Sequence, residues 1–471
     1  MAAVNSFDKF NLRNKTDKGI VMKSNFIERN SHYLKQIKEN FTDFIPKKYQ
    51  NRLMGNCQRI RSFDPLSTLF CFLFQSLEGH SCKLALTSLN LIRIKHGLKT
   101  VSLNTSGYCR ARKRLDEKVL KDLVSETGNQ LETESSFWRW KDRSVKLVDG
   151  TTLTMSDSKE NQKEYPQSDR QKKGLGWPMM RLVGIFSLSS GAITDFEIGK
   201  YSGKGQGEPS LLRRMINRLS PGDLLVLDRF FTGYFLHHDL LKQGVDVLVR
   251  IKDSVGKKYL KGNQKDLEVN IKRPQMRSIL DRNTLPELPM RVIKSEVKRK
   301  GYRVKVIYLM TSLLDKKNYS RKELEKLYTR RWDVELDLRN LKITLGADQL
   351  QCKTPEMVRK ELYVKLLAFN LIRKLIVSTC QVYRRARPRK YSFKTSLGAY
   401  VGLIKEVGIK SINKIIVMIS NEIVNSKYRR EARAIKRRKN TYPLLTKCRK
   451  EAKNEIWGYG RRRPGKGLLA I

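Results

Sequence analysis

The sequence predicts an α/β fold, with a sheet that is at least partly parallel and helical regions before and after it. The main observation is that apolar runs of strand length alternate with helical segments from residue 144 to residue 251. Such alternation is typical of βαβ units, whose strands lie parallel in one sheet. Up to about residue 140, and again from residue 381, the apolar residues recur at helical spacing instead. We therefore expect a central α/β domain between two helical regions.

Residues 1–140 are predicted to form a helical domain. Helix-start signals and helical spacing predict helices at 66–77 and 81–94, followed by a basic helix at 108–126. Small helical domains with a basic helix commonly bind DNA. We therefore expect the arginines of the third helix to contact DNA, although a packed helix with a solvated basic face is an alternative. These arginines are Arg110, Arg112 and Arg114.

Two aspartates follow predicted strands of the central domain. The expected strands are 144–149, 181–188, 192–199, 223–228 and 245–251, of which the second and third form a hairpin. The first ends in Asp149, before the turn signal Gly150-Thr151-Thr152, and the fourth ends in Asp228. Active residues gather at the carboxyl ends of strands in such sheets, so both aspartates are candidate site residues. Arg229 follows directly and is an expected DNA contact.

The rest of the chain divides into an insertion and a basic end. Residues 252–317 contain strand-like pieces and no clear helix, so we expect a small β insertion within a catalytic domain of residues 141–380. A long apolar helix at 354–379 is expected to pack on the sheet. Residues 381–471 are predicted to be helical and basic, with a disordered tail rich in Gly, Pro and Arg.

Residues 328–342, YTRRWDVELDLRNLK, are predicted to form one amphipathic α-helix. At about 100° per residue, four polar residues fall within a sector of about 60°. They are Tyr328, Arg331, Glu335 and Lys342. Arg339 lies on the same side. A face with one carboxylate, several cations and a phenol suits phosphates and a metal ion, whereas the alternative is a solvated helix face laced by ion pairs.

The composition indicates a polyanionic partner. Lys and Arg number 97 against 46 Asp and Glu, which gives a net charge of +51. This charge favours nucleic acid, and anionic membrane is the weaker alternative because no apolar run is long enough to span a bilayer. The chain starts without the apolar region of a signal peptide, and its seven cysteines are scattered. We therefore expect a cytoplasmic protein without a zinc site or a disulfide framework.

Asp149, Asp228 and Glu335 are the three carboxylates that we expect to share a site. Hard oxygen ligands of this kind bind Mg²⁺ or Mn²⁺. Two such ions about 4 Å apart can activate the attacking group and neutralise the leaving oxygen of an in-line phosphoryl transfer. A single strand-end aspartate is weak support, because many only cap a helix. Two of them, with a glutamate on a cationic helix face, predict a two-ion site.

Several segments resemble the transposases of bacterial insertion sequences, specifically the fourth insertion-sequence family. The Tyr-Arg-Glu-Lys signature of that family, Y-x2-R-x3-E-x6-K, is complete in residues 328–342. The segments around the two aspartates, LVDGTTLTMSDSKENQKEYPQ and GDLLVLDRFFTGY, also resemble the family. Similar segments extend the resemblance over nearly the whole chain: DPLSTLFCFLFQSLEGHSCKLAL, GLGWPMMRLVGIFSL and TYPLLTKCRKE.

This resemblance implies a ribonuclease-H-like catalytic core with a β insertion before the last acidic residue, and a homodimer across paired transposon ends. It also implies that Tyr328, Arg331 and Lys342 hold phosphates beside the metal site. Relatives use a tryptophan of the insertion to hold a flipped base, and this insertion has none. Tyr259 and Tyr302 are the alternatives for that role.

The prediction is a DDE transposase that cleaves the ends of its element and joins the 3′-hydroxyls to target DNA, with two Mg²⁺ or Mn²⁺ ions. Its expected partner is double-stranded DNA, both at the transposon ends and at the target. Two alternatives stay open. One is a ribonuclease-H-like nuclease or resolvase, which hydrolyses DNA without joining it, and the other is a non-catalytic DNA-binding derivative of a transposase.

Overall fold

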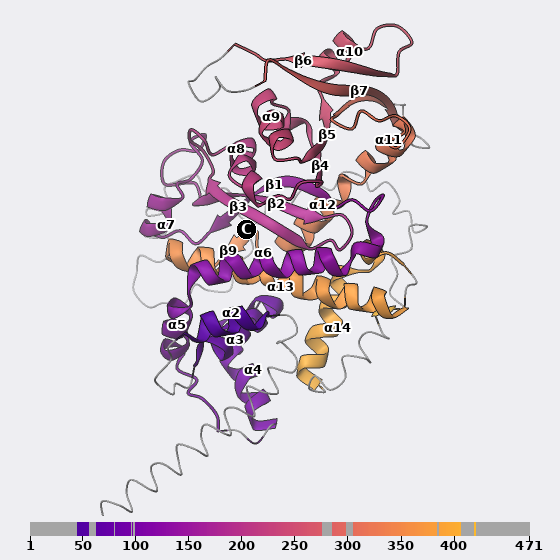
Figure 1. The fold of residues 1–471 in the computed structure, drawn as a ribbon. Helices are drawn as coiled ribbons and strands as arrows, with labels where there is room; N and C mark the ends of the chain where they lie inside the picture. Colours follow the sequence, from indigo (N-terminus) through magenta and orange to yellow (C-terminus); the bar gives the residue numbers. More distant parts are fainter. Residues whose placement is uncertain are drawn as a thin grey trace, which may run out of the picture.

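The computed structural model describes residues 45–55, 63–79, 81–95, 97, 99–275, 285–297, 305–383, 386–406 and 419–420. Within these residues the molecule is layered (Figure 1). A mixed sheet has helices on both faces, and the first helices of the chain form a further layer beneath one of these faces. None of the helices in the described residues is both long and apolar enough to cross a bilayer.

One mixed sheet has the strand order β3-β2-β1-β4-β5-β8-β7-β6, with β9 paired to β1. Strands β1, β4 and β5 are parallel to one another, and β2 and β3 run antiparallel on the β1 side. This arrangement is consistent with the ribonuclease-H-like core that the family resemblance implied. The strands are β1 (Val145–Met155), β2 (Met179–Ser187), β3 (Ile193–Lys200), β4 (Leu224–Leu227), β5 (Asp246–Ile251), β6 (Asp266–Lys272), β7 (Glu287–Val297), β8 (Lys305–Thr311) and β9 (Gln349–Leu350).

The five predicted core strands are present, but β1 is longer than expected. It continues through Gly150-Thr151-Thr152, where a turn was predicted, because these residues pair with β2, with Thr151 opposite Leu182. Further along β1, Thr154 pairs with Gln349 of β9. The turn prediction is therefore wrong, and Asp149 lies within the strand and not at its end.

The insertion extends the central sheet and does not form a separate unit. Strand β8 runs antiparallel to β5, with Leu248 opposite Thr311, and β7 and β6 follow outward. The three predicted strands are confirmed, but the expectation of no helix is wrong, since α10 (Asp253–Tyr259) follows β5. Gly256 in that helix weakened its helical signal. Its lack of a side chain allows close packing, because a Cβ there would lie 2.0 Å from the Tyr308 ring.

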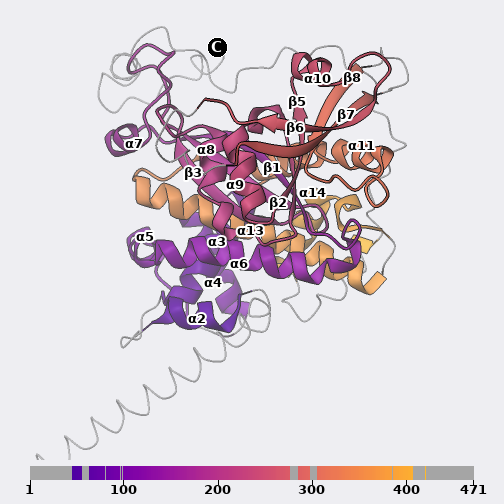
Figure 2. The ribbon, with the colours of Figure 1, turned by 45° about the horizontal axis from the view of Figure 1, so that its top comes forward.

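Different helices cover the two faces of the sheet. One face is covered by α8 (Glu208–Arg213) and α9 (Tyr234–Lys242), whose buried side chains share a core with β4, β5 and β7. The other face is covered by α6 (Glu117–Glu134) and α13 (Pro355–Tyr383), which lie side by side (Figures 1 and 2). The long apolar helix expected from residue 354 onward is therefore confirmed.

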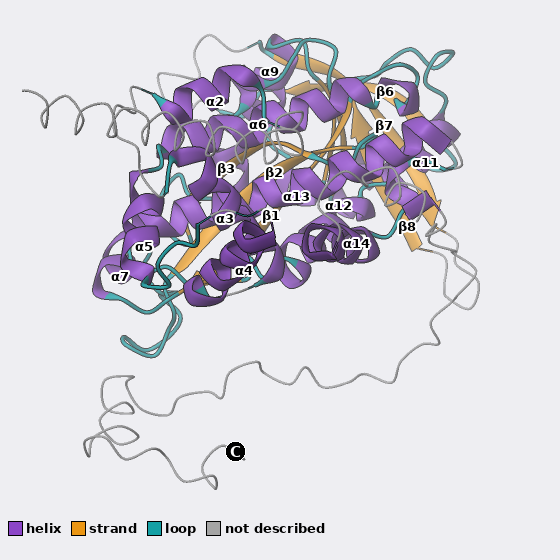
Figure 3. Ribbon diagram, turned by 90° about the horizontal axis from the view of Figure 1, so that it is seen from below, coloured by secondary structure: helices purple, strands orange, loops and turns teal. Residues whose placement is uncertain are grey.

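The N-terminal helices pack on α13 and share its core. They are α2 (Lys47–Met54), α3 (Pro65–Glu78), α4 (Cys82–Lys95) and α5 (Thr105–Arg114). Figure 3 shows α3 and α4 together with α14 (Phe393–Glu406) on the near side of the sheet. The predicted single helix at 108–126 is wrong, since the chain ends α5 at Arg114 and starts α6 after Asp116. The Asp116 carboxylate accepts a hydrogen bond from Val119 N at 2.9 Å and so caps the new helix.

Asn370 joins three elements at the centre of this packing. Its Nδ2 donates to Val124 O at 3.0 Å and to Ile193 O at 3.0 Å, and its Oδ1 accepts from Ile193 N at 2.9 Å. Helix α6 approaches β3 so closely that a Cβ on Gly128 would lie 1.9 Å from Ile193 O. The N-terminal helices are thus fixed to the sheet through α6 and α13.

The stretch predicted as one α-helix is divided into three helical pieces. These are α11 (Arg321–Thr329), α12 (Trp332–Arg339) and the π-helix η5 (Asn340–Thr344). A single period of about 100° per residue therefore does not hold from residue 328 to 342. Arg331 nevertheless contacts both Tyr328 and Glu335, so these three residues of the predicted face stay on one side. Shorter elements complete the fold: α7 (Lys159–Glu164), η1 (Ser136–Trp138), η2 (Ile216–Arg218), η3 (Arg229–Phe231) and η6 (Pro388–Lys390).

The predictions for the basic end of the chain lie mostly outside the described residues. Helix α14 falls within the predicted helical region 381–471. The basic runs at 428–439 and 461–463 fall outside the described residues. The division into three domains stays a prediction.

Candidate active site

The register of two parallel strands sets Asp149 beside Asp228. Leu147 of β1 pairs with Val226 of β4, and continuing this register by two residues places the two aspartates opposite each other. Adjacent strands lie about 4.8 Å apart, and residues two apart share a face. Since Leu147 and Val226 belong to the core on the α13 side, both carboxylates start from that face of the sheet.

Asp228 follows β4 directly and also caps a helical turn. Its Oδ1 accepts a hydrogen bond from Phe230 N at 2.7 Å, at the start of η3. The capping role, given above as the ordinary explanation of a strand-end aspartate, is therefore real. It leaves Oδ2 without a described hydrogen bond, so the carboxylate keeps an oxygen for another ligand.

Helix α12 brings Glu335 to the same region, because it packs against β1. Val334 and Leu338 are buried beneath it, whereas the Glu335 side chain is 43% exposed. The next turn of the helix is fixed by Asp337, which is 1% exposed and accepts hydrogen bonds from Arg373 and Arg389. This buried pair of arginines holds α12 against α13 and η6.

The Arg331 guanidinium lies between two of the three predicted metal ligands. Its Nη2 is 2.8 Å from Glu335 Oε1, and its Nη1 is 4.0 Å from Asp149 Oδ2. The residue is 9% exposed, and its Cζ is 4.7 Å from the centroid of the Trp332 ring. In this structure the arginine therefore supplies the positive charge between these carboxylates.

Burial makes Asp149 an unusually weak acid in the absence of a bound cation. Burial raises the pKa of its carboxyl to about 6, while the Gly150 N–H and the Arg331 guanidinium act in the opposite direction. The negative charges of Asp228 and Glu208 add to the increase. A divalent cation would favour the charged form of this group.

Tyr328 is 5% exposed and belongs to the core on the α13 side, at the end of α11. Burial raises the pKa of the phenol to about 12, so the hydroxyl is neutral at physiological pH. The charges of Arg331 and Asp228 influence the pKa of this phenol, although Tyr328 itself lies beneath the surface.

Glu208 is a charged neighbour of the two aspartates that the sequence reasoning missed, and it comes from α8, on the other face of the sheet. It is the first residue of α8, its Oε1 is 3.4 Å from Arg181 Nη1, and its carboxyl packs against the backbone of Gly150. Burial raises its pKa, and the charge of Asp228 raises it further. The Glu-Pro pair at 208–209 was used only as a helix-start signal, and nothing in the spacing connects it with the two aspartates.

The chemistry of these donors fits a divalent cation, although the side chains are not yet arranged around one. Carboxylate oxygens are the ligands that Mg²⁺ and Mn²⁺ prefer. Among the described residues, no three His, Cys, Asp or Glu side chains are placed to hold one ion as they stand. The Glu208 carboxyl fills the space beside Gly150 that a Cβ would take up. Arg331 lies in the gap between Asp149 and Glu335. An ion would therefore require Glu335 to leave Arg331.

The remaining cations predicted near the site lie at or near the surface. Arg229 and Arg339 are exposed, on the turn after Asp228 and at the end of α12. Lys342 is partly exposed in the π-helix η5. These positions keep the three side chains available to a ligand, and their DNA contacts stay predictions.

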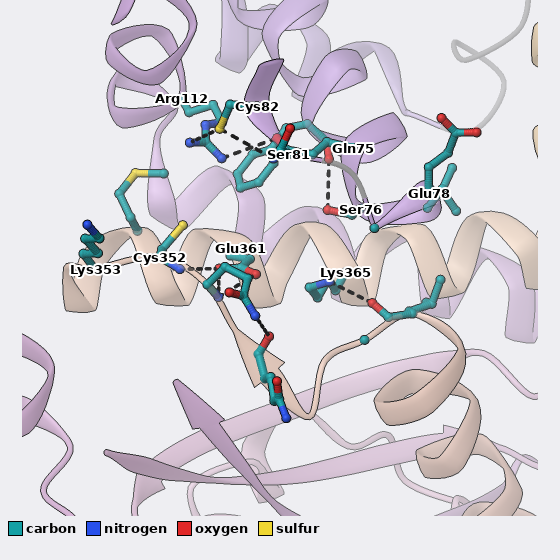
Figure 4. A pocket seen from close by; sticks show the side chains of 18 of the residues that line it. Gln75, Ser76, Glu78, Ser81, Cys82, Arg112, Cys352, Lys353, Glu361 and Lys365 are labelled. Carbon is teal, nitrogen blue, oxygen red and sulfur yellow. Dashed lines mark hydrogen bonds between the residues drawn. The ribbon is translucent and has the colours of Figure 1, made fainter. Parts of the chain in front are cut away.

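Arg112 differs from the surface role that we expected. It is 8% exposed, and its guanidinium lies 4.8 Å from the Phe72 ring centroid and 4.9 Å from that of Tyr108. Its Nη2 is 3.2 Å from Cys82 Sγ (Figure 4). We therefore reassign Arg112 to the packing of α3 against α5. Arg110 and Arg114 are exposed on α5 and keep the predicted surface position.

Figure 4 also shows the hollow beside Arg112, which has a volume of about 1020 Å³. It separates the N-terminal helices from the segment between η5 and α13. Charged side chains from α13 line it and are already paired: Glu361 accepts from Gln351 N and Cys352 N, and Lys365 donates to Leu345 O. These bonds fix the loop that follows the π-helix.

Tyr259 lines a smaller cavity of about 280 Å³ between α9, α10 and β7. It is half-buried there and packs against the core that contains Met290. Tyr302, the other alternative for holding a base, lies outside the described residues.

Comparisons with known proteins bear on the class of protein. Residues 140–371 match the family described as the transposase DDE domain, and this range contains all three predicted metal ligands. The matched residues run from before β1 to within α13.

A curated relative is the transposase InsG for insertion sequence element IS4 of Escherichia coli (strain K12). It is 25% identical over 356 residues, which cover 73% of this chain and 78% of that protein. Over most of its length, this chain is thus similar to a transposase of an insertion sequence element. A solved structure, the piggyBac transposase synaptic complex with hairpin DNA, covers 83% of this chain and 85% of its own at 11% identity, but its TM-score of 0.39 is too low to indicate a shared fold.

Proposed function

We propose that this chain cleaves the ends of its own insertion sequence and joins the resulting 3′-hydroxyls to target DNA by two-metal phosphoryl transfer. The observation that carries the proposal is that the register of β1 and β4 sets Asp149 beside Asp228, within the residues that match the transposase DDE domain family. Arg331 links Glu335 to Asp149. The curated relative acts, by its name, for an insertion sequence element.

In the proposed function, Asp149, Asp228 and Glu335 hold Mg²⁺ or Mn²⁺. These ions would lower the pKa of a bound water or 3′-hydroxyl and stabilise the leaving oxygen. The protein's own contribution is to fix the carboxylates on β1, β4 and α12. Because burial disfavours the charge on Asp149, binding of a divalent cation by this carboxylate would be coupled to release of a proton.

The proposed substrate is double-stranded DNA, at the transposon ends and at the target. Arg331 would exchange its pairing with Glu335 for a phosphate oxygen, while Arg229, Arg339 and Lys342 would contact neighbouring phosphates. Charge-assisted contacts of this kind are strong and salt-dependent. We further propose that Tyr328 orients Arg331, since its phenol is buried beside that side chain, and that the chain acts as a homodimer on paired ends.

Strand transfer of precut ends tests this function. A duplex that ends in the 3′-hydroxyl of the element should be joined to plasmid DNA in the presence of Mg²⁺ or Mn²⁺, and Asp228→Asn should abolish joining. The runner-up function, a nuclease or resolvase, predicts hydrolysis of the ends without joined product. A wild-type protein that neither cleaves nor joins its ends, yet binds them, would identify the non-catalytic alternative.

A salt titration tests the DNA partner separately. If about a dozen phosphates are neutralised, the logarithm of the affinity should fall with the logarithm of salt with a slope near about −10. A nearly flat slope would mean that the charge of +51 serves another partner.

A further inference from the structure

The connection between β1 and β2 contains a loop, residues 166–176, whose shape is held by a single side chain. The Gln167 amide donates from Nε2 to Gln171 O at 3.1 Å and to Lys172 O at 2.9 Å. Its Oε1 accepts a hydrogen bond from Gly174 N at 3.0 Å. These bonds fix a backbone that belongs to no helix or strand, so the loop does not depend on a ligand for its shape.

Gly176 closes this loop. Its N–H donates to Gln167 Oε1 at 3.1 Å, and its carbonyl oxygen accepts from Gln162 Nε2 at 3.1 Å. A Cβ on Gly176 would lie 2.6 Å from Gln167 Cβ and 2.3 Å from Gln171 Oε1. Only glycine therefore lets the two ends of the loop approach this closely.

The start of the same connection is tied to the segment before α13. Ser158 Oγ donates to Lys353 O at 2.5 Å, and Asn161 Nδ2 donates to Cys352 O at 3.1 Å. Because Asn161 belongs to α7, this short helix and the loop after it have a fixed place beside the core. Figures 1 and 2 show α7 and α11 toward opposite ends of the molecule.

The position of this loop relative to the proposed active site follows from β1. The strand continues from Asp149 to Met155, and Met155 N bonds to Pro178 O at the base of the connection. At about 3.3 Å per residue, this base lies about 20 Å from Asp149. A group that binds here cannot be the scissile phosphate, but it can be another part of the same DNA.

The loop presents three exposed cations, Arg170, Lys172 and Lys173, against one carboxylate, that of Asp169. In the part of the chain that the structure describes, none of these three cations forms an ion pair with a carboxylate. Holding like charges close together on a fixed loop is unfavourable unless an anion joins them. A charged loop that served only solubility would need no such fixed shape, whereas a loop that is already shaped loses less entropy when it binds phosphates.

We propose that residues 166–176 form a further DNA-contact surface, which binds backbone phosphates of duplex DNA about six base pairs from the scissile phosphate, since base pairs are about 3.4 Å apart. Lys172 and Lys173 contact the phosphates, and Gln167 is a positioning residue. This inference rests on the proposed function, because that function places the scissile phosphate at Asp149. It deepens the function by naming a contact to one arm of the DNA, on the element side or on the flanking side of the cleavage point.

Binding of element-end duplexes to the purified full-length protein, measured by fluorescence anisotropy at several salt concentrations, tests the proposal. Lys172→Gln combined with Lys173→Gln should weaken binding by about ten- to a hundredfold and make the log–log salt slope shallower by about 2. The matched control combines Lys204→Gln with Lys242→Gln, which removes the same charge from two other exposed positions. The control should change the affinity less than about threefold. Equal losses in both double variants would overturn the proposal, because net charge alone would then explain them.

Shortening the duplex locates the contact. One series shortens the element side of the cleavage point, and the other shortens the flanking side, each from about 20 to about 4 base pairs. The ratio of the wild-type affinity to that of the Lys172 and Lys173 double variant should approach one when the contacted arm falls below about six base pairs. Such a change in either series supports the proposal and identifies the arm. A ratio that does not depend on length in either series contradicts it.

Gln167→Ala tests the shape of the loop without changing its charge. It should weaken binding of the long duplexes by about three- to tenfold and leave binding of the shortest ones unchanged. The matched control is Gln243→Ala, a partly exposed glutamine whose side chain donates to Leu219 O at 3.3 Å, and it should bind both lengths like the wild type. Equal weakening at all lengths, or none at any length, would remove Gln167 from DNA binding. Thermal unfolding measures whether each variant is folded.

The same measurements distinguish failure of this inference from failure of the proposed function. A wild-type protein that binds no duplex DNA would overturn both. A wild type that binds and joins element ends, together with a Lys172 and Lys173 double variant that does so equally well, would overturn only the role of the loop. Weaker binding by the double variant, limited to duplexes with one long arm, is the expected result.

Discussion

The two aspartates and the signature helix region reach the same place by different means. Asp149 and Asp228 are placed by the register of two buried parallel strands. Glu335 comes from a stretch that is divided into α11, α12 and a π-helix, and its side chain is held by an arginine. The two strand aspartates, Asp149 and Asp228, therefore form the fixed half of the site. The helical half, which carries Arg331 and Glu335, is adjustable, because the ion pair between these two residues must break before Glu335 can bind a metal ion.

The largest expected effect tests the fixed half. Asp149→Asn or Asp228→Asn should reduce cleavage of transposon ends by about a thousandfold or more, which corresponds to about 4 kcal/mol in the barrier, because each removes a proposed metal ligand. Binding of end DNA should stay within about threefold, as measured by gel shift. Near-normal cleavage in either variant would remove that residue from the site.

Asp337 tests whether the adjustable half is anchored by its buried ion pairs. Asp337→Ala leaves Arg373 and Arg389 without their carboxylate in a buried place, so we expect a loss of about 3–5 kcal/mol in the free energy of unfolding. Urea denaturation measures it. The matched control is Asp333→Ala on the same helix, whose pair with Arg330 is more exposed and should be worth at most about 1 kcal/mol. Equal losses would show that the buried network does not anchor α12.

The raised pKa of Asp149 predicts an unusual pH dependence of stability in the metal-free protein. The folded-state pKa of about 6 exceeds the ordinary value of 3.8, so the folded state binds more protons between these values. The contribution of this group to stability is full below about pH 4 and is lost as the pH rises through 6, by up to about 3 kcal/mol. Asp149→Asn should therefore gain stability over the wild type across this window. The prediction is contradicted if the difference in the free energy of unfolding between Asp149→Asn and the wild type, measured in EDTA, stays constant from pH 4 to 7.

The smallest expected effect distinguishes the role of the cations Arg331 and Lys342 from that of the Glu335 carboxylate. Arg331→Ala and Lys342→Ala should weaken binding of precut ends by roughly ten- to a hundredfold, since one charge-assisted phosphate contact is worth about 1.5–3 kcal/mol. Mn²⁺ binding without DNA should persist in Lys342→Ala. If both variants bind and join ends like the wild type, the helix face serves only packing or solubility.

Strand patterns carried the prediction of the sheet, because a buried strand leaves a simple apolar run. The same pattern misjudged β1, since Gly150 was taken for a turn residue when its role is to admit the Glu208 carboxyl. The sequence alone does not show which side chain packs against a glycine in place of a Cβ. The contact comes from α8, 58 residues further along the chain.

Helical periodicity was less informative about the site than about the core. It located α3, α4 and α13, and α3 and α13 are buried over most of their length. It was only partly right across residues 328–342, because the break before Trp332 and the π-helix interrupt the single helix that was predicted. Arg112 was misplaced for a related reason: a guanidinium can lie buried on aromatic rings, and charge in the sequence does not distinguish this from a surface position.

The position of α13 has a consequence for synthesis of the protein. This helix lies between the N-terminal helices and the sheet and contributes to the core shared by both, yet it begins only at residue 355. On the ribosome, the first helices emerge long before the layer on which they rest. A nascent chain that stops before this point exposes two apolar surfaces that α13 would have covered, which makes it prone to aggregation and degradation.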